Sequence, residues 1–328
     1  MTTIAPGSAA EREAQQAKVD AEHVARIKNK LDPGVSRAEG WRRRGPLLPA
    51  LIFMIVVTQI PFLFTLYYST LSWNLVRPGS RQFVGLSNYL AVVKDSQFWS
   101  VSFNTVILIV GVVLISAVVG LLLALLLDRA FLGRGIVRTL LITPFLVTPV
   151  AAALIWKTTI LDPTNGILNW VLSLVGIGKV DWIGQFPLPA VMVELIWQWT
   201  PFMMLLILAG LQSMPRDILE AGGVDGANAF QLFRELTLPH LRRFIELGVV
   251  LGAIYLVNTF DVIYMMTQGG PGIASANLPF YIYQRAFLGF DMGQAAAMGV
   301  VVVIFTMIIA SFALRLIFKS FSGKEEAA

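Results

Sequence analysis

Six long stretches of apolar residues alternate with polar segments along this chain of 328 residues. A helix that crosses a membrane needs about 20 mostly apolar residues, because the hydrocarbon layer is about 30 Å thick. The six stretches that meet this requirement lie at about 46–71, 106–127, 140–160, 188–211, 245–266 and 295–318. The pattern therefore predicts an all-α membrane protein, a bundle of six transmembrane helices.

Two of the predicted spans contain proline. The third includes Pro144 and Pro149, and the fourth includes Pro201. Membrane helices tolerate such residues where neighbouring helices satisfy the backbone groups that proline leaves free. A packed bundle is therefore expected rather than six independent helices.

The polar segments divide the chain into three parts. Residues 1–45 form a polar N-terminal tail of mixed charge, which is unlike a secretory signal peptide. Residues 46–320 form the transmembrane domain, and residues 321–328 form a short C-terminal tail. The segment Trp41-Arg42-Arg43-Arg44, just before the first span, is typical of an anchor at the membrane interface.

The composition agrees with a membrane protein. Hydrophobic residues make up 56% of the chain and charged residues 14%, whereas soluble domains carry about 25% charged residues. These values exclude a disordered chain, a nucleic-acid binder with a basic face and an ordinary soluble enzyme. The chain has no cysteine, its two histidines (His23 and His240) are far apart, and no GxxxxGK motif occurs. We therefore predict no metal site, no catalytic residue and no ATP-binding phosphate loop in this chain.

Lys and Arg are unequally distributed between the two sides of the predicted membrane. The N-terminal tail, the loops 128–138 and 212–243 and the C-terminal end together hold 19 of the 25, and the other side holds six. Cytoplasmic loops carry the excess of Lys and Arg in membrane proteins. Both termini are therefore predicted to be cytoplasmic, which agrees with an even number of spans.

The cytoplasmic loop 213–239 is predicted to form a helix–turn–helix. Pro215 suits the first turn of a helix, where its missing N–H is no loss. Gly226 permits the positive φ of a tight turn, Asp225 can cap the second helix, and Pro239 is expected to end that helix. Apolar residues recur at a spacing of three along it: Ala227, Phe230, Phe233 and Leu236. From this spacing alone, the hairpin could simply cover the cytoplasmic end of the bundle.

The same loop resembles the EAA loop of permeases in binding-protein-dependent ABC importers. The family pattern is Glu-Ala-Ala, three residues, Gly, nine residues, Ile, one residue and Leu-Pro. The positions that match it are Glu220, Ala221, Gly226, Leu238 and Pro239, whereas Gly222 replaces the second Ala and Leu236 replaces Ile. The fuller form, with Asp225, Ala227 and Phe233, resembles the carbohydrate-importing branch, the maltose-permease-like proteins.

The resemblance extends over roughly residues 45–320. Further matching segments are 83–89, 98–99, 104–105, 199–203, 211–215, 260–261 and 269–271, together with Arg138, Pro144 and Trp156. The segment 272–300 is also similar to permeases for sugar alcohols. The resemblance implies the six-helix, type I fold of ABC importer permeases, with a cytoplasmic coupling helix, in the inner membrane of a bacterial cell.

The resemblance also implies partners. These are a second homologous permease chain, two ATPase subunits that bind ATP and Mg²⁺, and an extracytoplasmic binding protein that delivers a sugar or polyol. In this family the loop docks in a groove of the ATPase, where Glu220 would meet a basic residue. The residues implied in this coupling are Glu220, Ala221, Gly222, Asp225, Gly226, Ala227, Phe233, Leu238 and Pro239. The absence of a phosphate-binding loop from this sequence agrees with ATP hydrolysis on a separate chain.

Polar and aromatic residues in the fourth and fifth spans are candidates for the substrate pathway. A sugar needs hydrogen-bonding groups for its hydroxyls and aromatic faces for its C–H surfaces. In the fourth span Gln198 and Phe202 share a helical face, and Tyr255, Asn258 and Thr259 do so in the fifth. By resemblance, the cavity positions include Gln198, Trp199, Phe202, Tyr255, Leu256 and Thr259, and we add Asn258 and Asp261 as candidates.

Other interpretations of these residues remain open. The polar groups could bond between helices without lining any path, and Asp261 could lie near the external interface as a gate or structural partner. Lys157 and Glu194 are expected near the external ends of spans, where their chains reach water, and we assign them no role. The alternative function is a secondary transporter or facilitator, although many of these have ten or more spans in two repeats and the sequence contains no internal repeat.

Overall fold

The computed structural model of the chain describes residues 47–77, 79 and 81–322. The predicted N-terminal tail, with its Trp41–Arg44 anchor, lies outside these residues, as does most of the predicted C-terminal tail. The chain divides into two compact units, residues 1–63 and 64–328. The described part of the first unit is the beginning of helix α3 (Leu48–Ser69), whose side chains are almost all exposed apolar groups.

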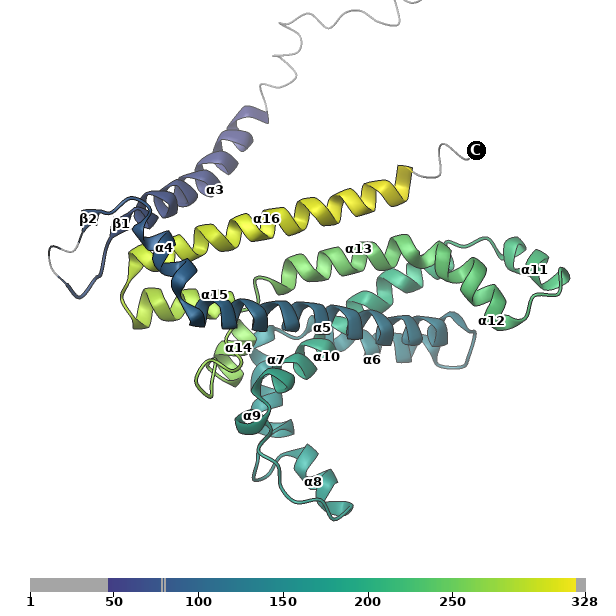
Figure 1. Cartoon of the computed structure of the whole chain (residues 1–328). Coiled ribbons are helices and arrows are strands. Elements are labelled where there is room, and N and C mark those ends of the chain that lie inside the picture. Colours follow the sequence, from purple (N-terminus) through teal and green to yellow (C-terminus); the bar gives the residue numbers. More distant parts are fainter. Residues whose placement is uncertain (1–46, 78, 80, 323–328) are drawn as a thin grey trace, which may run out of the picture. The chain divides into compact units, whose positions relative to one another are not determined.

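The second unit is helical apart from one short antiparallel pair of strands (Figure 1). The pair joins Leu71 to Phe83 and Ser72 to Gln82. Its elements are β1 (Leu71–Ser72), β2 (Gln82–Phe83), α4 (Ser87–Lys94), α5 (Ser96–Asp128), α6 (Arg134–Leu146), α7 (Pro149–Ile155), η2 (Trp156–Ile160), α8 (Ile167–Leu174), α9 (Trp182–Gln185), α10 (Pro187–Gln212), α11 (Arg216–Val224), α12 (Ala229–Gln231), η3 (Leu232–Thr237), α13 (Leu238–Leu256), α14 (Asp261–Met266), α15 (Leu278–Tyr283), η4 (Gln284–Leu288) and α16 (Met292–Ser322). The three η segments are π-helical turns.

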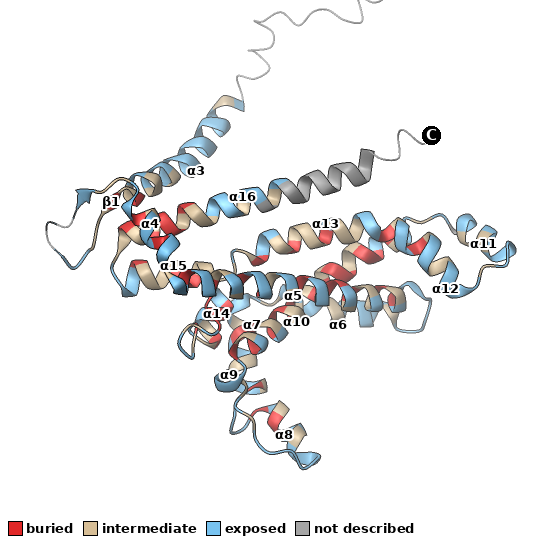
Figure 2. Cartoon of the chain, viewed as in Figure 1, coloured by how far each residue is buried: buried red, intermediate tan, exposed pale blue. Residues whose placement is uncertain are grey.

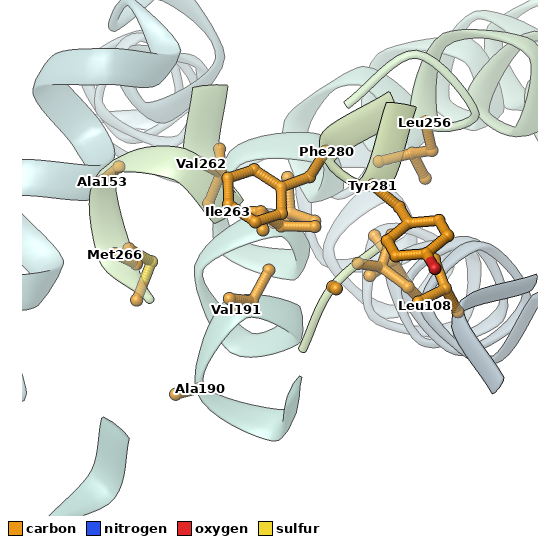
Figure 3. Packing of buried hydrophobic residues seen from close by; sticks show 14 of the residues in the cluster. Leu108, Ala153, Ala190, Val191, Leu256, Val262, Ile263, Met266, Phe280 and Tyr281 are labelled. Carbon is orange, nitrogen blue, oxygen red and sulfur yellow. The ribbon is translucent and has the colours of Figure 1, made fainter. Parts of the chain in front are cut away.

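Helices α5 and α10 form the centre of the unit. They pack along one another, and α13 packs against both and against α16. Buried apolar side chains gather where these helices meet α14 and α15, while the outer faces of the helices are exposed (Figure 2). In this core, Val191 of α10 lies beside Val262 and Ile263 of α14, with Phe280 of α15 next to them (Figure 3). Exposed apolar faces around a packed interior are expected for helices that meet lipid on the outside.

Each of the six predicted spans falls on helix, but not each is one straight helix. Judged by length and apolarity, three described helices could cross a membrane alone: α3, α5 and α10. The pair formed by α6 and residues 149–160 would be a fourth, but it bends by 99° at its break. The predicted fifth span is interrupted between α13 and α14, and α13 carries charged residues near its start. The sixth falls on α16, in which the stretch Met292–Ile308 is apolar.

The break between α6 and α7 follows from its prolines. Pro149 occupies the first turn of α7, and a residue before proline is forced towards extended backbone, as Thr148 shows with φ −63° and ψ 140°. Val147 is extended as well, so its carbonyl leaves the helical ladder. The side-chain amide of Gln198 in α10 donates a hydrogen bond of 2.9 Å to that carbonyl. A neighbouring helix thus satisfies the freed backbone group, as expected for a proline in a membrane helix.

A polar network joins two segments that are far apart in the sequence. The carboxylate of Asp95, which caps α5, accepts hydrogen bonds of 2.7 Å from both the hydroxyl of Tyr281 and the guanidinium of Arg285. Arg285 also donates to the Tyr281 oxygen at 2.8 Å. The network ties the start of α5 to α15 and η4, so it fixes the end of the bundle that precedes α16.

The loop between η2 and α10 is held together by one buried amide. Asn169 of α8 is 2% exposed, and its Nδ2 donates to the carbonyls of Pro163 and Val180 at 3.1 and 2.9 Å. Its Oδ1 accepts from the Val180 N–H and from the Trp182 indole N–H at 3.2 and 3.0 Å. These bonds replace regular secondary structure between the short helices α8 and α9.

Candidate functional site

The loop 213–239 contains the predicted helical hairpin. Helix α11 is followed by a tight turn in which Gly226 has φ +85°, and α12 then begins a second helical segment. A φ in this range strains any residue with a side chain, so the glycine at this position has a conformational cause. The hairpin projects from the end of the α10–α13 pair (Figure 1).

The ends of the two hairpin helices differ from the prediction. Asp225 does not cap the second helix; Asn228 does, because its side chain accepts from the Gln231 N–H at 3.0 Å while the Gln231 side chain accepts from the Asn228 N–H at 2.8 Å. The spacing Asn-x-x-Gln is a signal of this reciprocal cap in the sequence, and it was missed. Pro215 is the residue before α11, not its first residue.

Pro239 does not end the second helix either. The helical backbone continues from α12 through the π-helical η3 into α13, and Pro239 lies in the first turn of α13. A proline inside a helix clashes with the preceding turn and leaves one carbonyl unpaired. The wider π turn before it offers room for the ring, and the Thr237 hydroxyl donates to the Leu232 carbonyl at 3.3 Å.

The two departures from the family pattern, Gly222 and Leu236, meet in space. A Cβ atom on Gly222 would lie 2.7 Å from Leu232 Cδ2 and 3.1 Å from Leu236 Cδ1. Glycine at one position therefore makes room for the leucines on the other helix. Of the apolar stripe predicted on that helix, Phe230 is 68% exposed, whereas Ala227, Phe233 and Leu236 are half-buried.

Several of the predicted coupling residues lie on an exposed face of the hairpin. The side chains of Glu220, Ala221 and Asp225 are all exposed, as is Pro239. Leu238 is 36% exposed, at the edge of this face. Such an arrangement suits contact with another protein, because charged and apolar groups of the hairpin reach its surface together.

A cavity of about 240 Å³ lies at the break between α6 and α7. Three groups of residues line it: Phe145, Val147 and Pro149 from the break; Leu195, Gln198 and Trp199 from α10; and Tyr255, Asn258, Thr259, Phe260, Asp261 and Val262 from the end of α13 and the start of α14. The two interrupted spans thus face each other across it. Interruptions of helices inside a membrane are expected where the backbone lines a cavity.

Six of the eight predicted pathway residues line this cavity: Gln198, Trp199, Tyr255, Asn258, Thr259 and Asp261. Phe202 is not among the lining residues, but its ring stacks on that of Phe145, which is, with ring centroids 5.7 Å apart. Leu256 is 1% exposed and belongs to the apolar core. The other lining residues are Phe145, Val147 and Pro149 at the break, Leu195 of α10, and Phe260 and Val262 around the start of α14.

Aromatic rings form one wall of the cavity. Trp199 lies 5.8 Å from Phe145 and 5.6 Å from Tyr255, measured between ring centroids. Tyr255 is 61% exposed, so its ring and hydroxyl are accessible. The side-chain amides of Gln198 and Asn258 already donate hydrogen bonds within the protein. Gln198 donates to the Val147 carbonyl, and Asn258 donates to the Ile254 carbonyl at 3.0 Å. Both side chains keep an acceptor oxygen for a bound molecule.

The prediction that Glu194 reaches water is wrong. Its side chain is fully buried in α10, and neither carboxylate oxygen has a hydrogen-bond partner within the described part of the chain. Lys157 is half-buried, and its ammonium donates to the Met265 carbonyl of α14 at 3.0 Å. Among the described residues no cluster of three or more His, Asp or Glu side chains could hold a metal ion.

Comparison with known proteins gives consistent results. The family model described as "Binding-protein-dependent transport system inner membrane component" matches residues 116–323. A probable ABC transporter permease protein of Sinorhizobium fredii is 38% identical, over 84% of this chain and 89% of its own length. The trehalose/maltose transport system permease protein MalF of Thermococcus litoralis is 34% identical, over 77% of this chain and 86% of its own.

Solved structures share the fold. A chain of a bacterial ABC transporter involved in the import of the acidic polysaccharide alginate superposes with a TM-score of 0.74, covering 88% of this chain and 99% of that one at 22% identity. A second structure, of a bacterial alginate ABC transporter in complex with an alginate pentasaccharide-bound periplasmic protein, gives a TM-score of 0.73 at 23% identity, covering 87% of this chain and 96% of that one.

Proposed function

The chain belongs to the family of inner membrane components of binding-protein-dependent transport systems, and from this membership we propose that it translocates a sugar or a related polyol. It is a permease subunit and not an enzyme, and its helical fold is that of ABC importer permeases. The observation that carries the proposed cargo is the cavity between the interrupted spans, where aromatic rings and hydrogen-bonding groups face one space.

The chemistry of the lining supports a polyhydroxylated cargo. The faces of Trp199 and Tyr255 suit the C–H surfaces of a sugar, and the Tyr255 hydroxyl, the Gln198 oxygen and the Asn258 oxygen suit its hydroxyls. The relatives support the same class. The protein of Thermococcus litoralis is named for trehalose and maltose, and one of Agrobacterium fabrum, 34% identical over 83% of this chain, for sulfoquinovosyl glycerol.

The proposal includes the partners and the orientation. A second permease chain would complete the translocation pathway, two ATPase subunits would bind ATP and Mg²⁺, and an extracytoplasmic binding protein would deliver the cargo. The hairpin 213–239 would lie in the cytoplasm, with both termini, and dock on the ATPase through Glu220 and its neighbours. Closure of the ATPase pair would then move α10 and α13, which the hairpin connects.

Reconstitution tests this function and its alternative together. We expect proteoliposomes that contain the chain with its permease and ATPase partners to take up a sugar or polyol only when ATP and the binding protein are both present. Uptake that needs neither ATP nor the partner subunits would identify a facilitator or secondary transporter instead.

Glu220→Lys tests the coupling role of the hairpin. The charge reversal lies on an exposed surface, so the chain should still insert in the membrane, whereas uptake and co-purification of the ATPase should fall sharply. Glu235→Lys reverses a similarly exposed charge on the second helical segment and should have a milder effect. Wild-type uptake by the Glu220→Lys variant would contradict the coupling role.

A further inference from the structure

Two charged side chains stand apart in the apolar helical segments from α7 to α10. The described helices α7, η2, α8, α9 and α10 contain only Lys157 and Glu194 as charged residues. Lys157 has one partner, a neutral backbone carbonyl of Met265, and Glu194 has no hydrogen-bond partner in the described residues. Within the described part of the chain, neither side chain thus has an ionic partner.

The structure brings the elements that carry them together. The ring of Trp156, next to Lys157, contacts the ring of Trp197 in α10 edge to face, with centroids 5.9 Å apart. Trp197 is three residues from Glu194, which is the spacing of neighbours on one helical face. Helix α14 packs against both α7 and α10, and Figure 3 shows Met266 of α14 in the region of Ala153 of α7 and Ala190 of α10.

The unpartnered carboxyl group of Glu194 favours a second arrangement in which it has a partner. A buried carboxyl group without a hydrogen-bond partner is unfavourable, and its charged form is tolerated only beside a counter-charge. Glu194 is 0% exposed, so water does not relieve this cost in the conformation described. Lys157 has a long and flexible side chain and is only half-buried, so it can change partners without unfolding of its helix.

Helix α14 connects this region to the cavity. Its first residues, Asp261 and Val262, line the cavity, and its fifth residue, Met265, holds Lys157. Leu195 and Gln198 line the cavity. Glu194 lies directly before Leu195 and one helical turn before Gln198. Because α14 has only six residues, a shift of its beginning by a bound molecule also displaces the carbonyl that anchors Lys157.

We propose that Lys157 and Glu194 form an ion pair during the transport cycle, when movement of α14 releases the ammonium from the Met265 carbonyl. The pair acts as a latch that joins η2 to α10 next to the cavity. Glu194 is in this scheme a positioning residue: it does not touch the cargo but stabilises one conformation of the pathway. The inference rests on the proposed transport function.

Neutral variants test the pair by double-mutant analysis. We expect Glu194→Gln and Lys157→Gln each to slow ATP-driven uptake by about tenfold, because a charge-assisted contact is lost from one state. The double variant should be no slower than the slower single variant, since both substitutions remove the same interaction. Lys179→Gln is the matched control: this lysine also donates to a single backbone carbonyl, that of Thr164, at 3.0 Å. It should transport normally.

Cross-linking tests the movement independently of the cargo. The chain has no native cysteine, so Lys157→Cys/Glu194→Cys gives one defined pair in this subunit. In the assembled transporter, thiol cross-linkers of graded length should join the two positions with a shorter reagent in one nucleotide state than in another.

Two results would overturn the latch while leaving the transport function intact. One is wild-type uptake by Glu194→Gln, and the other is an identical cross-linking pattern with and without ATP. If the unmodified protein shows no ATP-driven uptake, the result would instead contradict the proposed function itself.

Discussion

Tyr255 offers the most direct test of the cavity at the scale of single residues. Its ring packs on Trp199, and its hydroxyl is accessible. Tyr255→Phe keeps the ring and loses one hydrogen bond, worth roughly 0.5–1.5 kcal/mol, so uptake should slow by a few-fold. Tyr255→Ala also removes the ring face and should slow uptake further.

The measurements for Tyr255 are uptake rate, affinity of the binding protein and basal ATP hydrolysis. Only the first should change, because the residue belongs neither to the binding protein nor to the hairpin. Equal uptake by the alanine variant and the wild type would mean that Tyr255 is a packing group.

Gln198 combines two roles that the sequence could not separate. Helical spacing was enough to place it on one face with the other candidates of α10. Its bond to the Val147 carbonyl depends on the 99° break in the preceding span, a tertiary feature that no local pattern specifies. The same reason explains Leu256: one position beyond Tyr255 on the helix, it turns into the core. Spacing predicts which residues share a face, but packing decides which face lines a cavity.

At the scale of the element, the hairpin depends on the turn at Gly226. A Cβ atom there would meet no heavy atom within 4 Å, so the cost of substitution is backbone strain at φ +85° rather than a clash. Gly226→Val should therefore cost on the order of 1 kcal/mol or more and weaken assembly with the ATPase.

Gly226→Asn is the matched control, since asparagine tolerates positive φ better than a β-branched residue. The amount of ATPase that co-purifies should be highest with the wild type, lower with Gly226→Asn and lowest with Gly226→Val. If valine co-purifies at the level of glycine, the tight turn is not required for docking.

The hairpin also illustrates how far local sequence signals reach. The turn was predictable because positive φ requires a specific residue type. The cap was misassigned to Asp225 because two cap-forming residues lie close together, and only the reciprocal bond of Asn228 with Gln231 distinguishes them. The effect of Pro239 was not predictable, because a π-helical turn replaces the expected helix end.

At the scale of the whole molecule, hydropathy located the spans better than it described them. The length of an apolar stretch locates a span, so all six predicted ranges fall mostly on helix. It does not detect interruptions, and both interruptions, after α6 and after α13, occur at the cavity. The helices thus depart from regular geometry at the place where the two interrupted spans meet, which is the proposed substrate pathway.

The Asp95 network gives a prediction about stability that concerns the whole molecule. Burial by itself raises the pKa of Asp95, but hydrogen bonds from Tyr281 and the Gln97 N–H and the charge of Arg285 outweigh it, so the pKa is lowered from its usual 3.8. A carboxyl group whose pKa is lower in the folded state stabilises that state above its unfolded pKa. This stabilisation disappears as the pH falls through the folded value.

Asp95→Asn should therefore lower the thermal unfolding temperature of the purified protein at neutral pH, because it unties α5 from α15 and η4. The difference from the wild type should be constant above about pH 5 and should shrink as the pH is lowered further, because protonation of Asp95 then removes the same charge in the wild type. Asp128→Asn, an exposed carboxyl at the other end of α5, serves as the control and should change the unfolding temperature little at any pH. A difference between Asp95→Asn and wild type that stays constant into the acidic range would mean that the Asp95 carboxylate charge does not hold these segments together.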